Sequence, residues 1–292
     1  MKSIFLTGSS GFVGINLINY FISSYEITRF KKDHPIFINE DIVIHLAGKA
    51  HDLKKISNPD DYYKNNTELT KQIFDAFILS NAKVFITLSS VKAAADEVHE
   101  ILTENILPNP KTHYGKSKLL AEQYILSQSI PNWKRVYILR PCLIHGKNNK
   151  GNLNLLFNFV SKGIPWPLGA FENQRSFCSI SNLMFIINEL INRDDINTGI
   201  YNVADDESLS TNAVIGILGE SIDKKTKIWN VSKFFINKLA ILGDLFHLPL
   251  TTERLQKLTE TYIVSNLKIK SALNKQLPYT TKDGLLHSFS RK

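Results

Sequence analysis

Short apolar runs alternate with amphipathic stretches through the first half of the chain. The apolar runs predict five buried strands, at residues 2–7, 25–30, 41–47, 83–89 and 135–140. Between these runs, apolar side chains recur at helical spacing, most clearly over 62–80 and 112–129. Strands that alternate with helices form a parallel sheet with helical crossovers. The expected fold class is therefore α/β, with a doubly wound parallel sheet.

The alternation loosens after the fifth strand. Two short strands are predicted near 176–180 and 200–203, and both are expected to return to the sheet. We therefore expect two domains. The first is a dinucleotide-binding, Rossmann-type domain over 1–145, and the second is a smaller, mainly helical substrate domain over 146–292.

A further stretch, residues 232–273, is predicted to be mainly helical and is rich in apolar side chains. Five of them are expected in the core: Phe234, Phe235, Leu239, Ile241 and Leu242. The alternative for this stretch is a helix that lies on a membrane surface. No apolar run approaches the roughly 20 residues that cross a bilayer, so no membrane insertion is expected.

The composition is that of a soluble globular protein, with 43% hydrophobic and 21% charged residues. The two cysteines, Cys142 and Cys178, make no disulfide framework and lack metal-ligand spacing, so we expect a reducing cytoplasm and no metal site. The net charge of +8 comes mostly from scattered lysines, and only seven of the 35 cationic residues are arginines. Because no stripe of arginines and aromatics is present, no nucleic-acid partner is expected.

Three glycines, Gly8, Gly11 and Gly14, separate the first strand from the first helix. The first permits a tight turn, the second lets the backbone approach a pyrophosphate, and the third lets the helix pack on the sheet. The amino end of that helix also favours an anion. The turn predicts a dinucleotide site made by six residues: Gly8, Ser10, Gly11, Phe12, Val13 and Gly14.

The end of the second strand favours NADP(H) over NAD(H). An acidic residue there usually binds the adenosine ribose 2′-hydroxyl of NAD. Here the strand ends in Arg29, followed by Lys31 and Lys32, and Asp33 comes late. Arg29 is the expected ligand of a 2′-phosphate. The alternative is a solvated strand end with NAD as the cofactor.

Tyr114 and Lys118 lie four residues apart at the start of a predicted helix, so they share one face. Ser90 follows the fourth strand, at the sheet edge where ligands bind. The lysine ammonium is expected to lower the pKa of the phenol from about 10, so that Tyr114 exchanges a proton with a sugar oxygen during hydride transfer. Ser90 is expected to hydrogen-bond the same oxygen. Ser90, Tyr114 and Lys118 are the predicted catalytic residues.

Together these motifs resemble the extended short-chain dehydrogenases/reductases of the nucleotide-sugar epimerase/dehydratase type, especially members from bacterial surface-polysaccharide synthesis. The resemblance extends along nearly the whole chain and rests on residues 7–14, 45–47, 65, 89–90, 114–118 and 139–141. It implies that Leu46, Ala47 and Gly48 flank the cofactor. It also implies that Lys118 contacts the nicotinamide ribose and that Pro141 packs near the nicotinamide. For Asn65, a functional role and a fold-stabilising role remain open.

The resemblance also implies a nucleotide-sugar site, with a UDP-sugar as the substrate. Asn152 is expected to contact the diphosphate, Arg175 to bind it through its planar guanidinium, and Arg254 to act as a second phosphate ligand. The alternative for Arg175 is a structural salt bridge. By analogy, the two long helices form the contact of a homodimer. One departure is that residues 31–40 are too short for the family's usual third strand.

Three functions remain open. The first is a 4-keto reductase acting on a UDP-4-keto-6-deoxy-HexNAc, which the missing ribose-binding acid favours. The second is a UDP-hexose or UDP-HexNAc 4-epimerase that keeps NAD bound. The third is a non-enzymatic regulator that senses a dinucleotide, and the complete Ser/Tyr/Lys set argues against it. A dehydratase is disfavoured because Val91 and Lys92 supply no carboxylate beside the serine.

Overall fold

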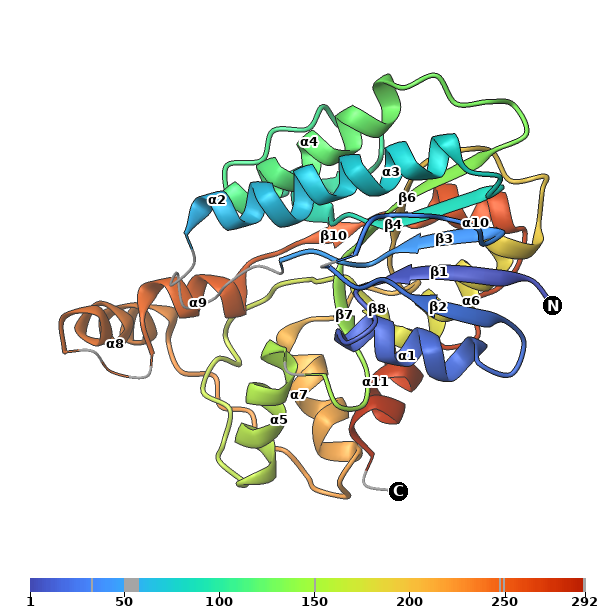
Figure 1. Cartoon of the computed structure of the whole chain (residues 1–292). Helices are drawn as coiled ribbons and strands as arrows, with labels where there is room; N and C mark the ends of the chain where they lie inside the picture. The colour runs from blue at the N-terminus through green and yellow to red at the C-terminus, as the bar shows by residue number, and fades with distance from the viewer. Residues whose placement is uncertain (33, 50–57, 150, 247, 249, 291–292) are drawn as a thin grey trace.

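A parallel sheet forms the centre of the computed structural model, which describes residues 1–32, 34–49, 58–149, 151–246, 248 and 250–290. Its six strands are β1 (Ser3–Thr7), β2 (Glu26–Arg29), β3 (Ile42–His45), β4 (Val84–Leu88), β6 (Arg135–Pro141) and β9 (Gly199–Val203). They lie in the order β2-β1-β3-β4-β6-β9, and all pairs are parallel (Figure 1). The chain order reverses between β1 and β3, and sheets of this kind bind ligands beyond the carboxyl ends of the strands at such a point.

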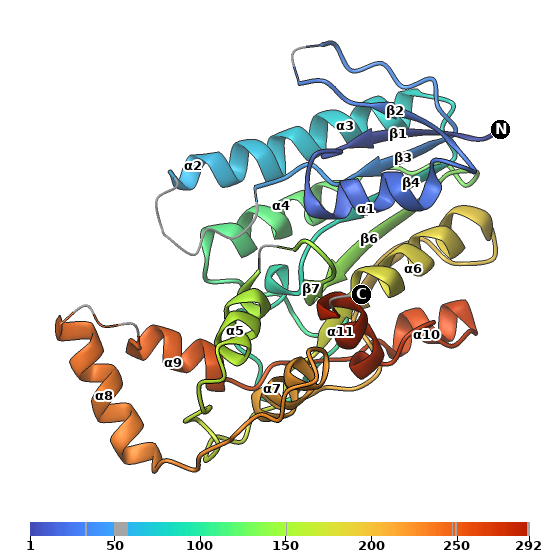
Figure 2. The ribbon, with the colours of Figure 1, turned by 90° about the horizontal axis from the view of Figure 1, so that it is seen from below.

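Helices cover both faces of the sheet, as a doubly wound fold requires (Figures 1 and 2). On one face, α3 (Leu69–Leu79) and α4 (His113–Ser127) pack their apolar side chains against the strands. On the other face lie α1 (Phe12–Phe21), α6 (Ile180–Asn192) and α10 (Leu267–Leu273). The predicted α/β fold class is confirmed, and the described residues of the 31–40 segment contain no strand, as expected from its short length.

A second apolar core lies beside the sheet and is mainly helical. It is formed by α5 (Asn152–Ser161), α7 (Thr211–Glu220), α8 (Lys233–Phe246), α9 (Thr252–Thr259) and α11 (Thr281–Phe289). Buried residues such as Leu218 and Leu285 hold it together. Since α6, β9 and α10 follow residue 145 but pack with the sheet, the two cores are interleaved along the chain.

The smaller elements correct one expectation. β8 (Phe177–Ser179) does not join the main sheet but pairs with β7 (Leu143–His145), whereas β9 does return to the sheet as predicted. β8 is held instead by β7 and by the amide of Asp205, just beyond β9, which donates to the carbonyl of Phe177 at 2.7 Å. The other short elements are α2 (Pro59–Tyr62), a π-helix (Tyr63–Glu68), a 3₁₀ turn (Val91–Ala93), β5 (Ile101–Leu102) and β10 (Ile263–Val264).

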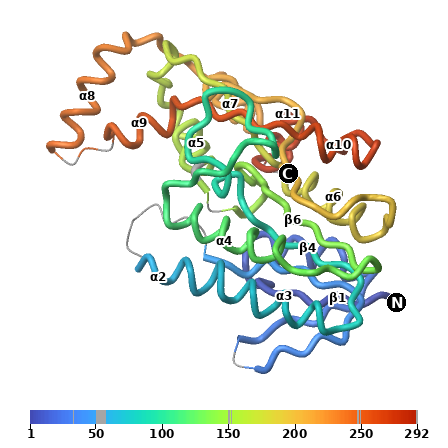
Figure 3. The backbone as a smooth tube through the Cα atoms, turned by 90° about the horizontal axis from the view of Figure 1, so that it is seen from above, coloured from blue at the N-terminus to red at the C-terminus, as the bar shows by residue number. Residues whose placement is uncertain are grey.

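The expectation of a buried 232–242 segment is wrong. The five apolar residues predicted in the core lie on α8 and are between 45% and 63% exposed: Phe234, Phe235, Leu239, Ile241 and Leu242. Helix α8 stands at one end of the molecule and packs mainly on α9, through Ile236, Ala240 and Gly243 (Figures 1 and 3). Among the described helices, none combines the length and the apolar character needed to cross a membrane.

Candidate active site

The glycine turn between β1 and α1 takes the conformation that its sequence predicts. Gly8 has φ +71°, and a Cβ there would stand 2.6 Å from the backbone nitrogen of Ala47. A Cβ on Gly14 would stand 2.2 Å from the carbonyl oxygen of Gly8. The amide of Gly11 donates to that same oxygen at 3.1 Å. The turn therefore closes tightly against the start of α1 and against the loop after β3.

This turn fits the pyrophosphate of a dinucleotide. Gly11 is the N-cap of α1, and no side chain caps the helix, so the first-turn N–H groups receive no partner from a capping side chain. A Cβ on Gly11 would meet nothing closer than 3.4 Å, and Ser10 is exposed beside it. Phe12 and Val13 begin the helix half-buried. All six residues predicted from this motif therefore lie at the turn.

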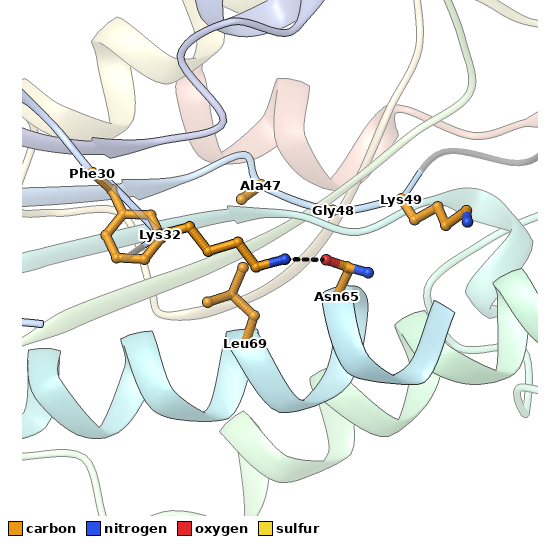
Figure 4. Close-up of a pocket in the computed structure, with 7 residues that line it drawn as sticks. All are labelled: Phe30, Lys32, Ala47, Gly48, Lys49, Asn65 and Leu69. Atoms are coloured by element: carbon orange, nitrogen blue, oxygen red, sulfur yellow. Dashed lines mark hydrogen bonds between the residues drawn. The ribbon is translucent and has the colours of Figure 1, made fainter. Parts of the chain in front are cut away.

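A cavity of about 320 Å³ opens beyond the carboxyl ends of β2 and β3 (Figure 4). It is lined by Phe30, Lys32, Ala47, Gly48, Lys49, Asn65 and Leu69. None of these seven side chains is acidic, and the ammonium of Lys32 lies 3.5 Å from Oδ1 of Asn65. Arg29 is exposed on β2 and does not line the cavity. The cation that lines the cavity next to β2 is thus Lys32 rather than the expected Arg29.

Asn66, which the sequence reasoning missed, fastens the loop that follows β3. Its carboxamide accepts from the amide of Lys49 at 2.7 Å and donates to the carbonyl of Lys49 at 3.1 Å. It also donates to Oγ of Ser117 on α4 at 3.0 Å. Asn66 is fully buried, and it lies in the π-helix, whose wider turn shifts the register of the side chains. The family resemblance had pointed instead to its neighbour Asn65.

Lys118 lies where the carboxyl ends of β3 and β4 meet. Its ammonium donates to the carbonyl of Leu88 at 2.8 Å, and a Cβ on Gly48 would stand 3.1 Å from it. Burial lowers the pKa of Lys118 to about 8, and the carboxylate of Glu122 acts in the opposite direction. The lysine is therefore buried beside Gly48, one of the residues expected to flank the cofactor.

Tyr114 and Ser90 come together at the same end of the sheet. Tyr114 stands in the first turn of α4 and is hydrogen-bonded to Ser90, which caps the 3₁₀ turn after β4. The ring of Tyr62 meets the ring of Tyr114 edge-on, with 6.1 Å between the centroids. The predicted trio of Ser90, Tyr114 and Lys118 is thus gathered beyond β4, and Tyr62 is an additional neighbour.

The electrostatics of Tyr114 differ from the expectation. Burial raises the pKa of Tyr114 above its usual value of 10.0, the hydrogen bond with Ser90 lowers it, and the neighbouring Tyr62 raises it. Lys118 directs its ammonium to the carbonyl of Leu88. The phenol is consequently protonated at neutral pH, rather than made acidic by the lysine.

A buried histidine holds the loop that carries Leu46, Ala47 and Gly48. The Nδ1 atom of His45 lies 2.7 Å from Oγ1 of Thr7, and its Nε2 atom lies 2.9 Å from Oγ1 of Thr70. Thr7 also accepts from the amide of Ala47 at 3.0 Å. Burial, with a smaller contribution from the nearby Lys118, lowers the pKa of His45 to about 3, so the ring is neutral.

Ser89 and Ser90 are hydrogen-bonded to different residues of α4. Its hydroxyl donates to the carboxylate of Glu122, which also accepts from Nε of Arg140 at 2.9 Å. Glu122 and Arg140 form a buried ion pair between α4 and β6. The pair orients α4 relative to the sheet, and β6 then ends at the buried Pro141, which was expected beside the nicotinamide.

Among the residues expected to bind the substrate diphosphate, Arg175 is engaged in contacts within the protein. Arg175 donates to the carbonyl of Lys257 at 2.6 Å and pairs with the carboxylate of Glu260 at 3.2 Å, which is the structural alternative left open from sequence. Arg254 lies exposed on α9, and its amide is bonded to the capping Thr251. Asn152 begins α5, but its side chain lies outside the described part of the structure.

Comparisons with known proteins identify the family of the chain. Residues 4–204 match the model of the NAD dependent epimerase/dehydratase family. The chain belongs to this family. A UDP-glucose 4-epimerase of Vibrio cholerae is 29% identical, over 97% of this chain and 93% of that protein. An N-acetyl-alpha-D-glucosaminyl-diphospho-ditrans,octacis-undecaprenol 4-epimerase of Escherichia coli O157:H7 is 26% identical, over 92% and 84%.

A solved structure supports the fold of this epimerase/dehydratase family member. The dTDP-4-dehydrorhamnose reductase of Bacillus anthracis, in complex with NADP, superposes with a TM-score of 0.76 at 19% identity and covers 99% of both chains. Membership of the family confirms the prediction of an NAD(P)-dependent enzyme.

Proposed function

We propose that the protein is a 4-keto reductase that acts with NADPH on a UDP-4-keto-6-deoxy-HexNAc. The observation that carries the proposal is the cavity beyond β2 and β3, where Lys32 stands and no lining side chain is acidic. A 2′-hydroxyl is usually held by a carboxylate, whereas a 2′-phosphate is held by cations. A reductase that consumes its cofactor stoichiometrically draws on the phosphorylated dinucleotide.

The protonated state of Tyr114 supports a reaction in which the C4 ketone is reduced. When bound, the dinucleotide supplies the hydride that is added to the C4 carbonyl carbon. Tyr114 then donates its phenolic proton to the C4 oxygen, and Ser90 donates a hydrogen bond that holds this oxygen. Because the pKa of Tyr114 is raised, the phenol carries the required proton at neutral pH. Lys118, whose ammonium lies beside Gly48, is assigned to the nicotinamide ribose of the bound dinucleotide.

A second candidate is a UDP-sugar 4-epimerase that retains NAD. It is favoured by the two curated relatives reported above, both named as 4-epimerases and both matched over most of their length. An epimerase must first remove a proton from the C4 hydroxyl, so its tyrosine starts as phenolate. The lining of the cavity beyond β2 and β3, with Lys32 and no acidic side chain, favours the reductase over this candidate.

The group that carries the sugar is proposed to be a diphosphate. One of the two relatives is named for a UDP-sugar and the other for a sugar on undecaprenyl diphosphate, and a diphosphate is common to both names. We assign its recognition to Arg175, Asn152 and Arg254, with UDP as the first carrier to test.

A homodimer through α3 and α4 is likewise a proposal, supported by the exposed Leu79, Leu120 and Leu126 on these helices.

Two measurements test the proposal. The purified protein is denatured and the released nucleotide is identified, then the native protein is titrated with NADPH and NADH. A reductase yields little bound nucleotide, prefers NADPH and oxidises it when a UDP-4-keto-6-deoxy-HexNAc is added. Stoichiometric NAD, together with interconversion of UDP-HexNAc epimers, would overturn the reductase in favour of the epimerase.

A further inference from the structure

The outward side of α8 is apolar, although nothing in the described structure covers it. It carries six exposed apolar side chains in addition to Phe235 and Leu242: Phe234, Leu239, Ile241, Leu245, Phe246 and, just beyond the helix, Leu248. The opposite side of α8 consists of the three buried residues Ile236, Ala240 and Gly243, which pack towards α9. A Cβ on Gly243 would collide with the carbonyl oxygen of Leu250.

The cations on and before α8 are not all directed to this apolar side. Lys238 lies within it, with its ammonium 4.4 Å from the ring centroid of Phe234, and Lys225 and Lys227 are exposed in the segment before the helix. The ammonium of Lys233 lies 5.7 Å from the ring centroid of Phe171, and that of Lys224 donates to the carbonyl of Ser161. The one acid of α8, Asp244, is turned to α9, because its carboxylate accepts from the hydroxyl of Thr252 at 2.6 Å.

The helix also lies at the end of the molecule towards which the strands point their carboxyl ends (Figure 1). Its neighbour α9 contacts Arg175, which bonds the carbonyl of Lys257 on α9 and the carboxylate of Glu260 just beyond it.

We propose that α8 lies on the surface of an anionic lipid bilayer, with its apolar side buried in the boundary between headgroups and acyl chains. An amphipathic helix with exposed aromatics and flanking lysines has the chemistry for this position, and it does not cross the membrane. A second copy of the chain fits less well. A two-fold contact through this face would bury Lys238 of both copies in the interface, whereas anionic headgroups neutralise its charge.

Binding of α8 to the bilayer does not depend on the proposed function, so the two are measured separately.

The test is flotation of the full-length protein with vesicles, comparing phosphatidylglycerol/phosphatidylcholine mixtures with phosphatidylcholine alone. Wild type is expected to float with the anionic vesicles and to be released at high salt. The double variant Phe235→Ser/Leu242→Ser is expected to lose at least tenfold in vesicle affinity. Asn237→Ser, on the same helix and equally exposed, is the matched control and is expected to bind like wild type.

NADPH binding and turnover of a soluble UDP-sugar are measured for all three proteins and are expected to be equal. Equal turnover with lost flotation supports the proposal, and loss of turnover in every protein would count against the proposed function alone. Absence of wild-type flotation overturns the membrane assignment. So does equal flotation of the double variant. Self-association that the double variant abolishes, without vesicle binding, would assign the face to a second copy instead.

Discussion

Gly115 lies so close to the carbonyl oxygen of Lys92 that a Cβ at position 115 would stand 2.4 Å from it. Lys92 belongs to the 3₁₀ turn that Ser90 caps, and Gly115 directly follows Tyr114 on α4. Contact between these two backbones therefore sets the distance between the two hydroxyls that are predicted to hold the C4 oxygen of the sugar.

A methyl group at position 115 is expected to separate that turn from α4. For Gly115→Ala we expect kcat to fall by at least tenfold, which is ~1.4 kcal/mol of transition-state stabilisation. Dinucleotide affinity should change little, because the glycine turn after β1 is not involved. The measurements are steady-state kinetics and NADPH titration. Gly216→Ala on α7 is the control, since a Cβ there meets nothing within 4 Å, and it should stabilise the fold by ~0.5–1 kcal/mol.

Tyr114→Phe removes the transferable proton and little else. We expect turnover to fall by ~10²–10⁴-fold with unchanged NADPH affinity. Tyr124→Phe is the matched control, because Tyr124 lies on the same helix and its hydroxyl donates to Asp75 at 2.6 Å, outside the site. Unaltered turnover in Tyr114→Phe would rule the phenol out as the acid.

The sequence was sufficient for the features that depend on local pattern. The glycine turn is readable because strand, turn and helix follow each other directly, and Ser90 and Tyr114 follow from their places at the end of a strand and the start of a helix. The exposure of the apolar side chains of α8 could not be predicted from the sequence. Its apolar residues satisfy the pattern of a buried helix, and only the tertiary structure reveals that one side of this helix joins the second core while the other stays exposed.

Other features of the site depend on long-range contacts. Asn66 acts through a π-helix, and periodicity assumes an ordinary helix. The pKa of Tyr114 was expected to fall because spacing places Lys118 nearby. The sequence does not reveal how deeply the phenol is buried, nor that the ammonium is bonded to the carbonyl of Leu88. Burial and partner choice therefore decide what spacing alone leaves open.

His45 makes the stability of the fold depend on pH. Its pKa is about 3 in the folded chain and about 6.5 when unfolded, so between these values the unfolded chain binds more protons. Stability is fully present above pH 6.5 and is lost as the pH falls towards 3. We expect His45 to account for about 2 kcal/mol of lost unfolding free energy between pH 7 and pH 5. Urea unfolding of wild type and His45→Gln at both pH values measures it, and an equal loss in the variant would contradict the assignment.

Lys32 is expected to set the preference between the two dinucleotides. Lys32→Ala should weaken NADPH binding about tenfold relative to NADH, or ~1.4 kcal/mol, because only NADPH carries the 2′-phosphate. Arg29→Ala is the natural comparison, as Arg29 is a neighbouring exposed cation that does not line the cavity. Isothermal titration with both dinucleotides gives the ratio. A larger change in Arg29→Ala would return the role to the residue expected from sequence.

Arg175 has two possible roles, and its pairing with Glu260 allows them to be separated. If the guanidinium binds the substrate diphosphate, Arg175→Ala should raise the KM for the UDP-sugar about tenfold with little change in kcat. Glu260→Gln removes the competing carboxylate but keeps Arg175, so it should leave KM unchanged or lower it. If the pair only holds α9 in place, both variants lose similar stability in thermal unfolding and their KM values rise together. The KM of Glu260→Gln therefore decides between a ligand of the diphosphate and a structural salt bridge.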